Sequence, residues 1–398
     1  MSFLDRRSPP HILTLVLATG LAALSLNIYL PSLPGMARHF NVDYATMQLA
    51  VSGYLAVSAL AQFAIGPISD RYGRRPVMLA VVGLFTAASL ASLFAPTAGL
   101  FLAARFVQAV VATTFVLSRA AVRDMLPGPE AASMIGYVTM GMSVVPMVAP
   151  VIGGGLDAAF GWQASVLVQV LGGLVLVALI WADLGETVRG GGMGFAAQAR
   201  AYPVLARSQR FWGYSLSAAT SAGLFYAYLG GAPVVGEKAF GLSPAEVGYY
   251  FALPSLGYMI GNWVSGRFSI RLGTDRMVLL GTGLATATLA LAWAASLTGT
   301  LGPLVFFGAV GLTGVGNGLC LPSANAGLMS VRPELAGTAS GLGATLTIGT
   351  GAALAALTAR LLGEEVSVPT LLGVMLTTST LSVLAILWVI RRRQALGV

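Results

Sequence analysis

Twelve apolar segments, each of membrane-spanning length, constrain the fold of this chain more than any other feature. A helix needs about 20 consecutive apolar residues to cross a bilayer. Only 9% of the 398 residues are charged, against about 25% in a soluble globular protein. We therefore predict an all-α polytopic membrane protein with 12 transmembrane helices. The predicted spans are roughly 12–34, 46–66, 77–95, 99–122, 131–155, 163–182, 211–233, 246–266, 277–297, 301–325, 337–361 and 369–390.

The longest polar connection divides the twelve spans into two six-helix halves. It joins the sixth and seventh spans and holds Arg189, Arg200, Arg207, Arg210 and the run Gly190, Gly191 and Gly192. We therefore expect an N-terminal half over 1–183, a cytoplasmic linker over 184–210 and a C-terminal half over 211–398.

A weak internal repeat supports two pseudo-symmetric halves. A shift of 200 residues aligns Gly66, Ser69, Arg71 and Gly73 with Gly266, Ser269, Arg271 and Gly273. Both stretches join the second and third spans of their half, and parallel six-helix repeats are one known transporter architecture. The apolar segments on either side also predict that 66–76 is a connection at a membrane surface.

The basic residues orient the chain. Cytoplasmic loops of membrane proteins carry an excess of Lys and Arg. With the N-terminus inside, 18 of the 22 Lys and Arg residues fall in inner loops and tails, 3 in outer loops, and Arg105 lies within a span. We therefore expect both termini in the cytoplasm. The same distribution explains the net charge of +8 without a nucleic-acid partner.

The stretch Gly66–Arg75 (GPISDRYGRR) resembles the signature between the second and third helices of the major facilitator superfamily. Four further stretches resemble the bicyclomycin/chloramphenicol resistance (Bcr/CflA) branch of its drug efflux members. They are Asn27–Pro34, Arg105–Gln108, Arg119–Asp124 and Pro146–Gly154. The resemblance implies a major facilitator fold and proton-coupled export of small drugs from the bacterial inner membrane by alternating access. It also implies no cofactor and no enzymatic activity.

The same resemblance assigns a gating motif. It implies that Asp70 contacts the eleventh helix, near Gly337 and Thr338, when the inner side is closed. The alternative is that the charges only anchor the topology. The motif residues are Gly66, Asp70, Arg71, Gly73, Arg74, Arg119 and Arg123.

Arg105 is the only basic residue well inside a span, and Gln108 follows at i+3 on the same helix face. A charge at the centre of a span costs roughly 2.5–3.5 kcal/mol on insertion scales, so such residues face protein or a watery cavity. Arginine keeps its proton, so Arg105 is a poor proton carrier. Two readings stay open: a role in substrate binding or proton coupling, and a structural hydrogen-bond hub.

Position 27 departs from the branch, whose members usually carry Asp there as the likely proton carrier. Asn27 can hydrogen-bond a substrate but cannot carry a proton. Coupling then uses a peripheral acid, or transport is uncoupled, or this position was changed deliberately. Ala109 and Ala149 stand where the family has Gly, and at both positions one small residue replaces another. Six further candidates for a substrate cavity are Tyr29, Tyr54, Met142, Phe225, Tyr226 and Tyr228. The alternative is that these side chains face lipid or pack in the core.

The fifth span carries the residues of the branch's antiporter motif, which implies a flexible, closely packed hinge. They are Pro146, Pro150, Gly153 and Gly154. Ordinary membrane-helix packing is the alternative, because Gly and Pro are frequent in such helices.

Three other functions compete with export. An enzyme is disfavoured because His11 and His39 lie at opposite membrane sides and Cys320 has no nearby base. A channel is disfavoured because no filter or pore repeat is present. An importer or uncoupled facilitator of a small metabolite stays open. Without an acid in the middle of a span, we expect neutral or polar drugs, phenicol-like or bicyclomycin-like, and a monomer in the lipid bilayer.

Overall fold

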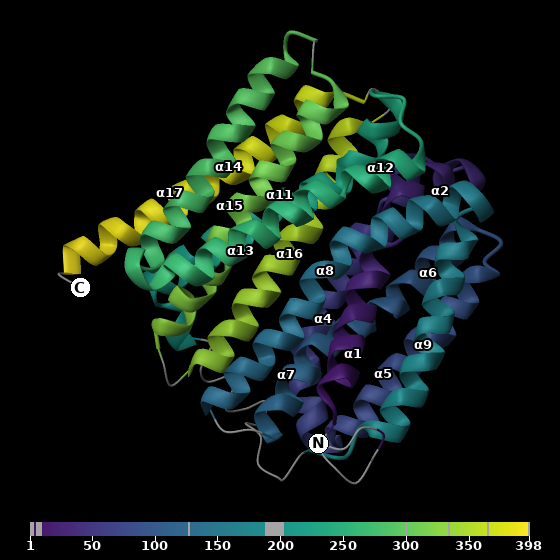
Figure 1. Ribbon diagram of the computed structural model, residues 1–398, viewed down its shortest axis with the longest axis horizontal. Coiled ribbons are helices and arrows are strands. Elements are labelled where there is room, and N and C mark those ends of the chain that lie inside the picture. Colours follow the sequence, from purple (N-terminus) through teal and green to yellow (C-terminus); the bar gives the residue numbers. More distant parts are fainter. Residues whose placement is uncertain are drawn as a thin grey trace.

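The computed structural model describes residues 4, 10–125, 128–187, 203–299, 301–332, 335–363 and 366–396. Every regular element among these residues is a helix. The predicted linker, 184–210, lies mostly outside the described residues. Figure 1 shows long helices that run side by side and short helices, α2 and α12, at one end of the molecule.

The helices up to residue 183 pack mainly on one another and form the N-terminal helix group. They are α1 (Ile12–Asn27), η1 (Leu30–Ser32), α2 (Leu33–His39), α3 (Tyr44–Met47), α4 (Leu49–Tyr72), α5 (Arg74–Leu93), α6 (Ala98–Gln108), η2 (Ala109–Thr113), α7 (Thr114–Met125), α8 (Gly128–Phe160) and α9 (Gln163–Asp183).

The helices from residue 209 onward form the C-terminal helix group, which again packs mainly on itself. They are α11 (Gln209–Lys238), α12 (Pro244–Tyr250), α13 (Ala252–Leu272), α14 (Thr274–Ser296), α15 (Pro303–Ser330), α16 (Ala336–Leu362) and α17 (Val368–Leu396).

Nine helical runs among the described residues are long and apolar enough to cross a membrane. They cover nine of the twelve predicted spans. The other three predicted spans, 131–155, 211–233 and 246–266, fall on α8, on α11 and on α12 with α13. These three are helical as predicted but are not among the nine.

The connection predicted over 66–76 is much shorter than expected. Helix α4 continues through Asp70 to Tyr72, and α5 begins at Arg74. Gly73 alone joins them, with a φ of 96° that only glycine adopts without strain. The second half repeats the joint at Gly273, whose φ is 80°. The repeat seen in the sequence is therefore real, but both stretches are helical up to a one-residue turn.

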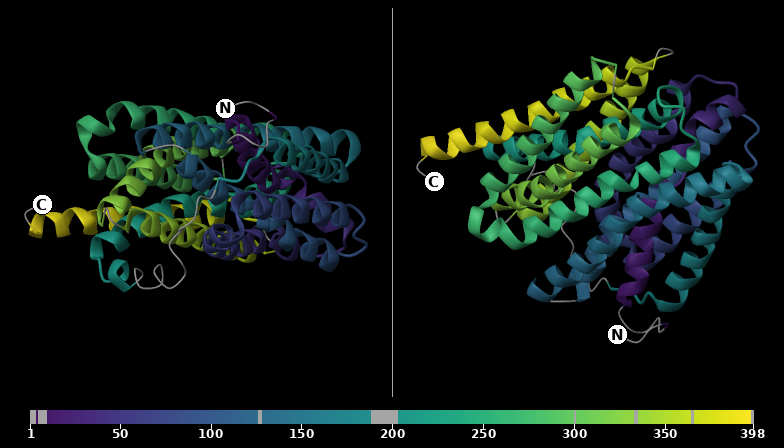
Figure 2. Two further views of the ribbon diagram at one scale, coloured as in Figure 1. Left: turned by 90° about the horizontal axis from the view of Figure 1, so that it is seen from below. Right: turned by 45° about the horizontal axis from the view of Figure 1, so that its top comes forward.

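The two helix groups are close together at one end and diverge at the other. Figure 1 shows them meeting near α2 and α12 and separating toward the ends that carry the chain termini, and the right view of Figure 2 agrees. The main contacts between the groups join α4 to α16 and α8 to α12 and α13. We call the end formed by η1, α2, α3, α12 and the adjoining ends of α8 and α11 the joined end.

Candidate functional site

The first predicted span is interrupted where the sequence places its prolines. Helix α1 ends at Asn27, and the 3-10 turn η1 follows with Pro31 in its first positions. Proline has no backbone N–H and cannot continue an α-helical ladder. The break turns Tyr29 into the interior, where it is 2% exposed and its hydroxyl donates to the Ala50 carbonyl at 2.9 Å.

Arg105 of α6 is the centre of a buried hydrogen-bond network. It is 1% exposed. Its Nε donates to the Tyr29 hydroxyl at 2.6 Å and to the Ala50 carbonyl at 3.3 Å. Its Nη1 donates to Ser25 Oγ at 3.0 Å and to Gln108 Oε1 at 2.6 Å, and Nη2 donates to the Ser25 carbonyl at 2.5 Å. All three guanidinium nitrogens are therefore used.

Two aromatic rings complete the surroundings of this guanidinium. Its central carbon lies 4.3 Å from the ring centroid of Tyr29 and 4.1 Å from that of Tyr54. Gln108 Nε2 donates to Ser92 Oγ of α5 at 3.0 Å, which extends the network to that helix. Within the described residues no carboxylate forms an ion pair with Arg105. The network therefore joins α1, α4, α5 and α6 of one group by bonds to neutral groups.

Asn27 lies at the end of α1, and its hydrogen bond among the described residues stays within that helix. Its Nδ2 donates to the Ala23 carbonyl at 2.7 Å, and the residue is 3% exposed. The structure brings Tyr29, Arg105 and Gln108 together, while Asn27 lies beside their network rather than in it.

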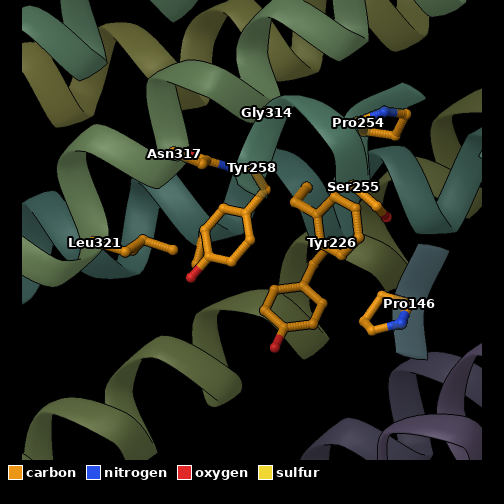
Figure 3. Close-up of a pocket in the computed structure, with 10 residues that line it drawn as sticks. Pro146, Tyr226, Pro254, Ser255, Tyr258, Gly314, Asn317 and Leu321 are labelled. Atoms are coloured by element: carbon orange, nitrogen blue, oxygen red, sulfur yellow. The ribbon is translucent and has the colours of Figure 1, made fainter. Parts of the chain in front are cut away.

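A cavity of about 220 Å³ lies on the side of the C-terminal helix group that faces α8. Of the ten described lining residues, nine belong to α11, α13 and α15, and Pro146 of α8 lies at the cavity from the other group (Figure 3). The lining residues are Pro146, Ala222, Phe225, Tyr226, Pro254, Ser255, Tyr258, Gly314, Asn317 and Leu321.

The cavity is aromatic and uncharged. Phe225, Tyr226 and Tyr258 supply flat apolar faces, and Ser255 and Asn317 supply polar atoms. None of the described residues that line it is charged. A site of this kind accommodates a small molecule by stacking and a few hydrogen bonds.

The prediction located only part of this cavity. Phe225 and Tyr226 were cavity candidates and line it, and so does Pro146, which was predicted as a hinge residue. Tyr29, Arg105 and Gln108 instead form the separate buried network in the N-terminal group. The side chain of Met142 lies outside the described residues. Ser255, Tyr258 and Leu321 were not singled out from the sequence, although tyrosine and serine within an apolar segment are a usable signal.

Two glycine contacts bring the helix groups together at the joined end. A Cβ added at Gly154 of α8 would lie 2.4 Å from the carbonyl oxygen of Pro244 in α12. In return, a Cβ at Gly248 of α12 would lie 2.4 Å from the Pro150 carbonyl oxygen. Backbones thus touch across the seam between the groups. Within the N-terminal group, a Cβ at Gly153 would lie 1.5 Å from the Ile28 carbonyl oxygen. The close packing fits the prediction for Gly153 and Gly154; their action as a hinge stays a prediction.

Polar contacts reinforce the same seam, and none of them was predicted from the sequence. Arg38 of α2 forms an ion pair with Glu237 of α11. The Tyr44 hydroxyl donates to the Gly230 carbonyl at 3.2 Å, and Gln48 Nε2 reaches the Leu229 carbonyl at 3.5 Å.

A proline explains why one of these carbonyls accepts a bond from the other group. Pro233 lies inside α11, four residues after Leu229. Because proline has no N–H, the Leu229 carbonyl loses its usual partner within the helix. Gln48, which is fully buried, supplies a donor from the N-terminal group.

The predicted gating motif forms an ion-pair network at the opposite end. Arg74 pairs with Asp70 of α4 and with Asp124 of α7, the latter at 3.1 Å. Glu186 accepts the backbone N–H of Arg74 at 2.9 Å and so caps the start of α5. Asp70 is paired within its own helix group, and the contact with the eleventh helix near Thr338 that the resemblance implies stays a prediction.

The other residues of the predicted gating motif lie in α4, in α7 and at the joint between α4 and α5. Gly73 makes the joint described above, and Gly66 lies inside α4 with open space where a Cβ would be. Arg71 stacks over Tyr72, 5.4 Å from the ring centroid. Arg119 lies in α7, and the side chain of Arg123 lies outside the described residues.

The comparison with protein families decides the identity of this fold. Residues 15–356 match the model of the Major Facilitator Superfamily. The chain belongs to the Major Facilitator Superfamily. Its architecture is also similar to that of a bacterial homologue of the human lysosomal transporter Spinster in an inward-facing and occupied conformation. The two structures match over 96% of each chain, with a TM-score of 0.71 and 17% sequence identity.

Three relatives within the superfamily carry drug-resistance names. The multidrug resistance protein D of Escherichia coli is 30% identical over 89% of this chain and 90% of its own. A bicyclomycin resistance protein homologue of Haemophilus influenzae is 28% identical over 87% and 88%. A chloramphenicol resistance protein of Pseudomonas aeruginosa is 28% identical over 80% and 76%. The predicted resemblance to the bicyclomycin/chloramphenicol resistance branch is confirmed.

Proposed function

We propose that this facilitator exports small neutral drugs across the bacterial inner membrane by alternating access, working as a monomer. The observation that carries the proposal is the uncharged aromatic lining described for the cavity, which lies where the C-terminal group faces α8. The two helix groups are joined at one end and diverge at the other, as alternating access requires. The resistance names of the relatives favour a drug as the substrate. Phenicol-like and bicyclomycin-like molecules, which are polar without a net charge, match the uncharged lining.

The basic residues identify the sides of the membrane. Asp70, Arg74 and Arg75 lie at the diverging end, together with both chain termini. The excess of arginine at this end favours the cytoplasm. The described conformation is then inward-facing, with the joined end toward the outside. A substrate enters from the cytoplasm, the diverging ends close on it, and the joined end opens to release it.

Export is tested by drug accumulation in an efflux-deficient bacterial strain. We expect cells that express the protein to accumulate less chloramphenicol than cells with an empty vector. Tyr226→Ala removes one aromatic wall of the cavity, so we expect at least a tenfold loss of export, in line with about 1–3 kcal/mol for a stacked aromatic contact. Tyr249→Ala is the control, because Tyr249 is 61% exposed on α12. Higher accumulation of every drug tried would contradict export and favour import.

Proton antiport is the second part of the proposal. Asn27 favours the competing proposal that this protein is an uncoupled facilitator. An amide cannot take up a proton at physiological pH. In membrane vesicles we therefore expect transport by the chain as it stands to respond weakly to a pH gradient.

Asn27→Asp is expected to make transport steeply dependent on the pH gradient, because it places a titratable group at the usual coupling position. Asn27→Gln is the matched control and keeps the position neutral. Transport rates that respond to the gradient equally in all three versions would show that another group carries the proton.

A further inference from the structure

A hydrogen bond inside the C-terminal helix group orients the one amide that faces the cavity. Ser221 Oγ of α11 donates to Asn317 Oδ1 of α15 at 2.7 Å. The two residues are 2% and 5% exposed. Asn317 lines the cavity, whereas Ser221 lies behind it. This bond therefore connects a cavity side chain to a partner that a substrate does not touch.

The direction of the bond decides which amide atom is left for a substrate. An amide side chain has one acceptor oxygen and two N–H donors. Since the oxygen is already used by Ser221, the nitrogen remains. Among the hydrogen bonds of the described residues none uses Asn317 Nδ2, and Figure 3 shows this nitrogen directed toward Tyr258.

We propose that Ser221 is a positioning residue that presents the Asn317 amide N–H to the cavity, and that the cavity thereby selects neutral aromatic molecules carrying an acceptor oxygen, such as a nitro group. This inference rests on the proposed function and names the substrate class of the same site. The aromatic ring of the substrate lies among Phe225, Tyr226 and Tyr258, and its oxygen accepts from Asn317 Nδ2.

The chemistry of the site disfavours charged substrates. Aromatic faces attract a lipophilic cation, but the described lining offers no carboxylate to neutralise its charge in a largely apolar site. An anion needs a cation within reach, and each guanidinium nitrogen of Arg105 already donates inside the other helix group. A molecule that lacks an acceptor leaves the amide N–H unpaired in an apolar site, which lowers its affinity.

The test compares two probes on purified protein in detergent. One probe is chloramphenicol, which carries a nitro group on its ring; the other is the same molecule with an isopropyl group in place of the nitro group. The two groups have similar shapes, but only the nitro group accepts hydrogen bonds. Competition against radiolabelled chloramphenicol gives both affinities. We expect the native protein to prefer the nitro probe about fivefold to tenfold, the size of one hydrogen bond.

The variants separate positioning from recognition. Asn317→Leu removes the donor, so we expect the preference to vanish while the isopropyl probe binds as before or more tightly. Ser221→Ala frees the amide to turn, so we expect the preference to fall by at least half. Ser221→Thr keeps the hydroxyl and should restore it. Elution of each variant as a single species from a sizing column controls for folding.

Each outcome has one meaning. Equal affinity of the native protein for the two probes would overturn the inferred substrate class, while export of either would leave the proposed function intact. A preference unchanged in Ser221→Ala would overturn the positioning role. Failure of the native protein both to bind and to export either probe would contradict the proposed function itself.

Discussion

Adding one methyl group at Gly154 is expected to open the joined end of the transporter. In the described conformation the new Cβ would lie 2.4 Å from the Pro244 carbonyl oxygen and 3.0 Å from the carbonyl carbon, both in α12 of the other helix group. Both atoms are backbone, so no side-chain rotation relieves the overlap. The joined end therefore cannot close as described in Gly154→Ala, and the protein should shift toward a population that is open at this end and lose most of its export.

A buried cysteine reports this shift. Met47 is fully buried at the joined end. Met47→Cys, combined with Cys320→Ser, should react slowly with a membrane-impermeant maleimide applied from outside. Adding Gly154→Ala should accelerate the reaction at least tenfold, because one order of magnitude corresponds to about 1.4 kcal/mol in the gating equilibrium.

Gly155→Ala is the matched control for this experiment. Gly155 is the next residue along α8, and nothing lies within 4 Å of the Cβ that alanine would add there. Alanine is also the better helix former, so this variant should label slowly and export normally. Equal labelling rates in the two alanine variants would show that the seam at Gly154 does not limit opening.

Replacing Arg105 is expected to have the second large effect. Arg105→Met removes the five hydrogen bonds and both ring contacts described for the guanidinium. One hydrogen bond to a charged group contributes roughly 1.5–3 kcal/mol, and the buried partners lose theirs as well. We expect a markedly lower melting temperature in detergent and at least a tenfold loss of export. Arg392→Met, at an exposed position of α17, is the control.

The same variant separates the two roles that the sequence left open for Arg105. If Arg105 is a structural hub, stability and export fall together, and Arg105→Lys recovers part of both because an ammonium still donates three bonds. Normal stability with abolished export would instead assign Arg105 a direct role in substrate binding or coupling.

The sequence predicted the fold well because the bilayer imposes strong local rules. Long apolar segments must be helical when no water can satisfy the backbone. The main error concerned the stretch after Gly66. Its charges suggested a loop, whereas Gly73 alone makes the turn and the charged residues continue the helices on both sides.

The site was harder to predict because it depends on the register between helices. Gln108 follows Arg105 by three residues, so its position on the same face was predictable. The bonds of Arg105 to Ser25 and Ala50 depend on how α1 and α4 meet α6. In the same way, the bond of Asn317 to Ser221 and the exposure of Asn317 to the cavity depend on how α15 packs on α11 and α13.

The glycine packing of α13 and α15 limits how the drug spectrum of this transporter can evolve. A Cβ at Gly314, in the cavity wall, would lie 2.2 Å from the Pro254 carbonyl oxygen, and one at Gly257 would lie 1.9 Å from that of Gly311. A larger residue at Gly314 or Gly257 pushes the two helices apart instead of reshaping the cavity. Heritable changes of substrate range must therefore arise mainly on the side-chain walls, at Phe225 and Leu321. Only substitutions at these few positions would allow the cavity to accept a new antibiotic without loss of the fold.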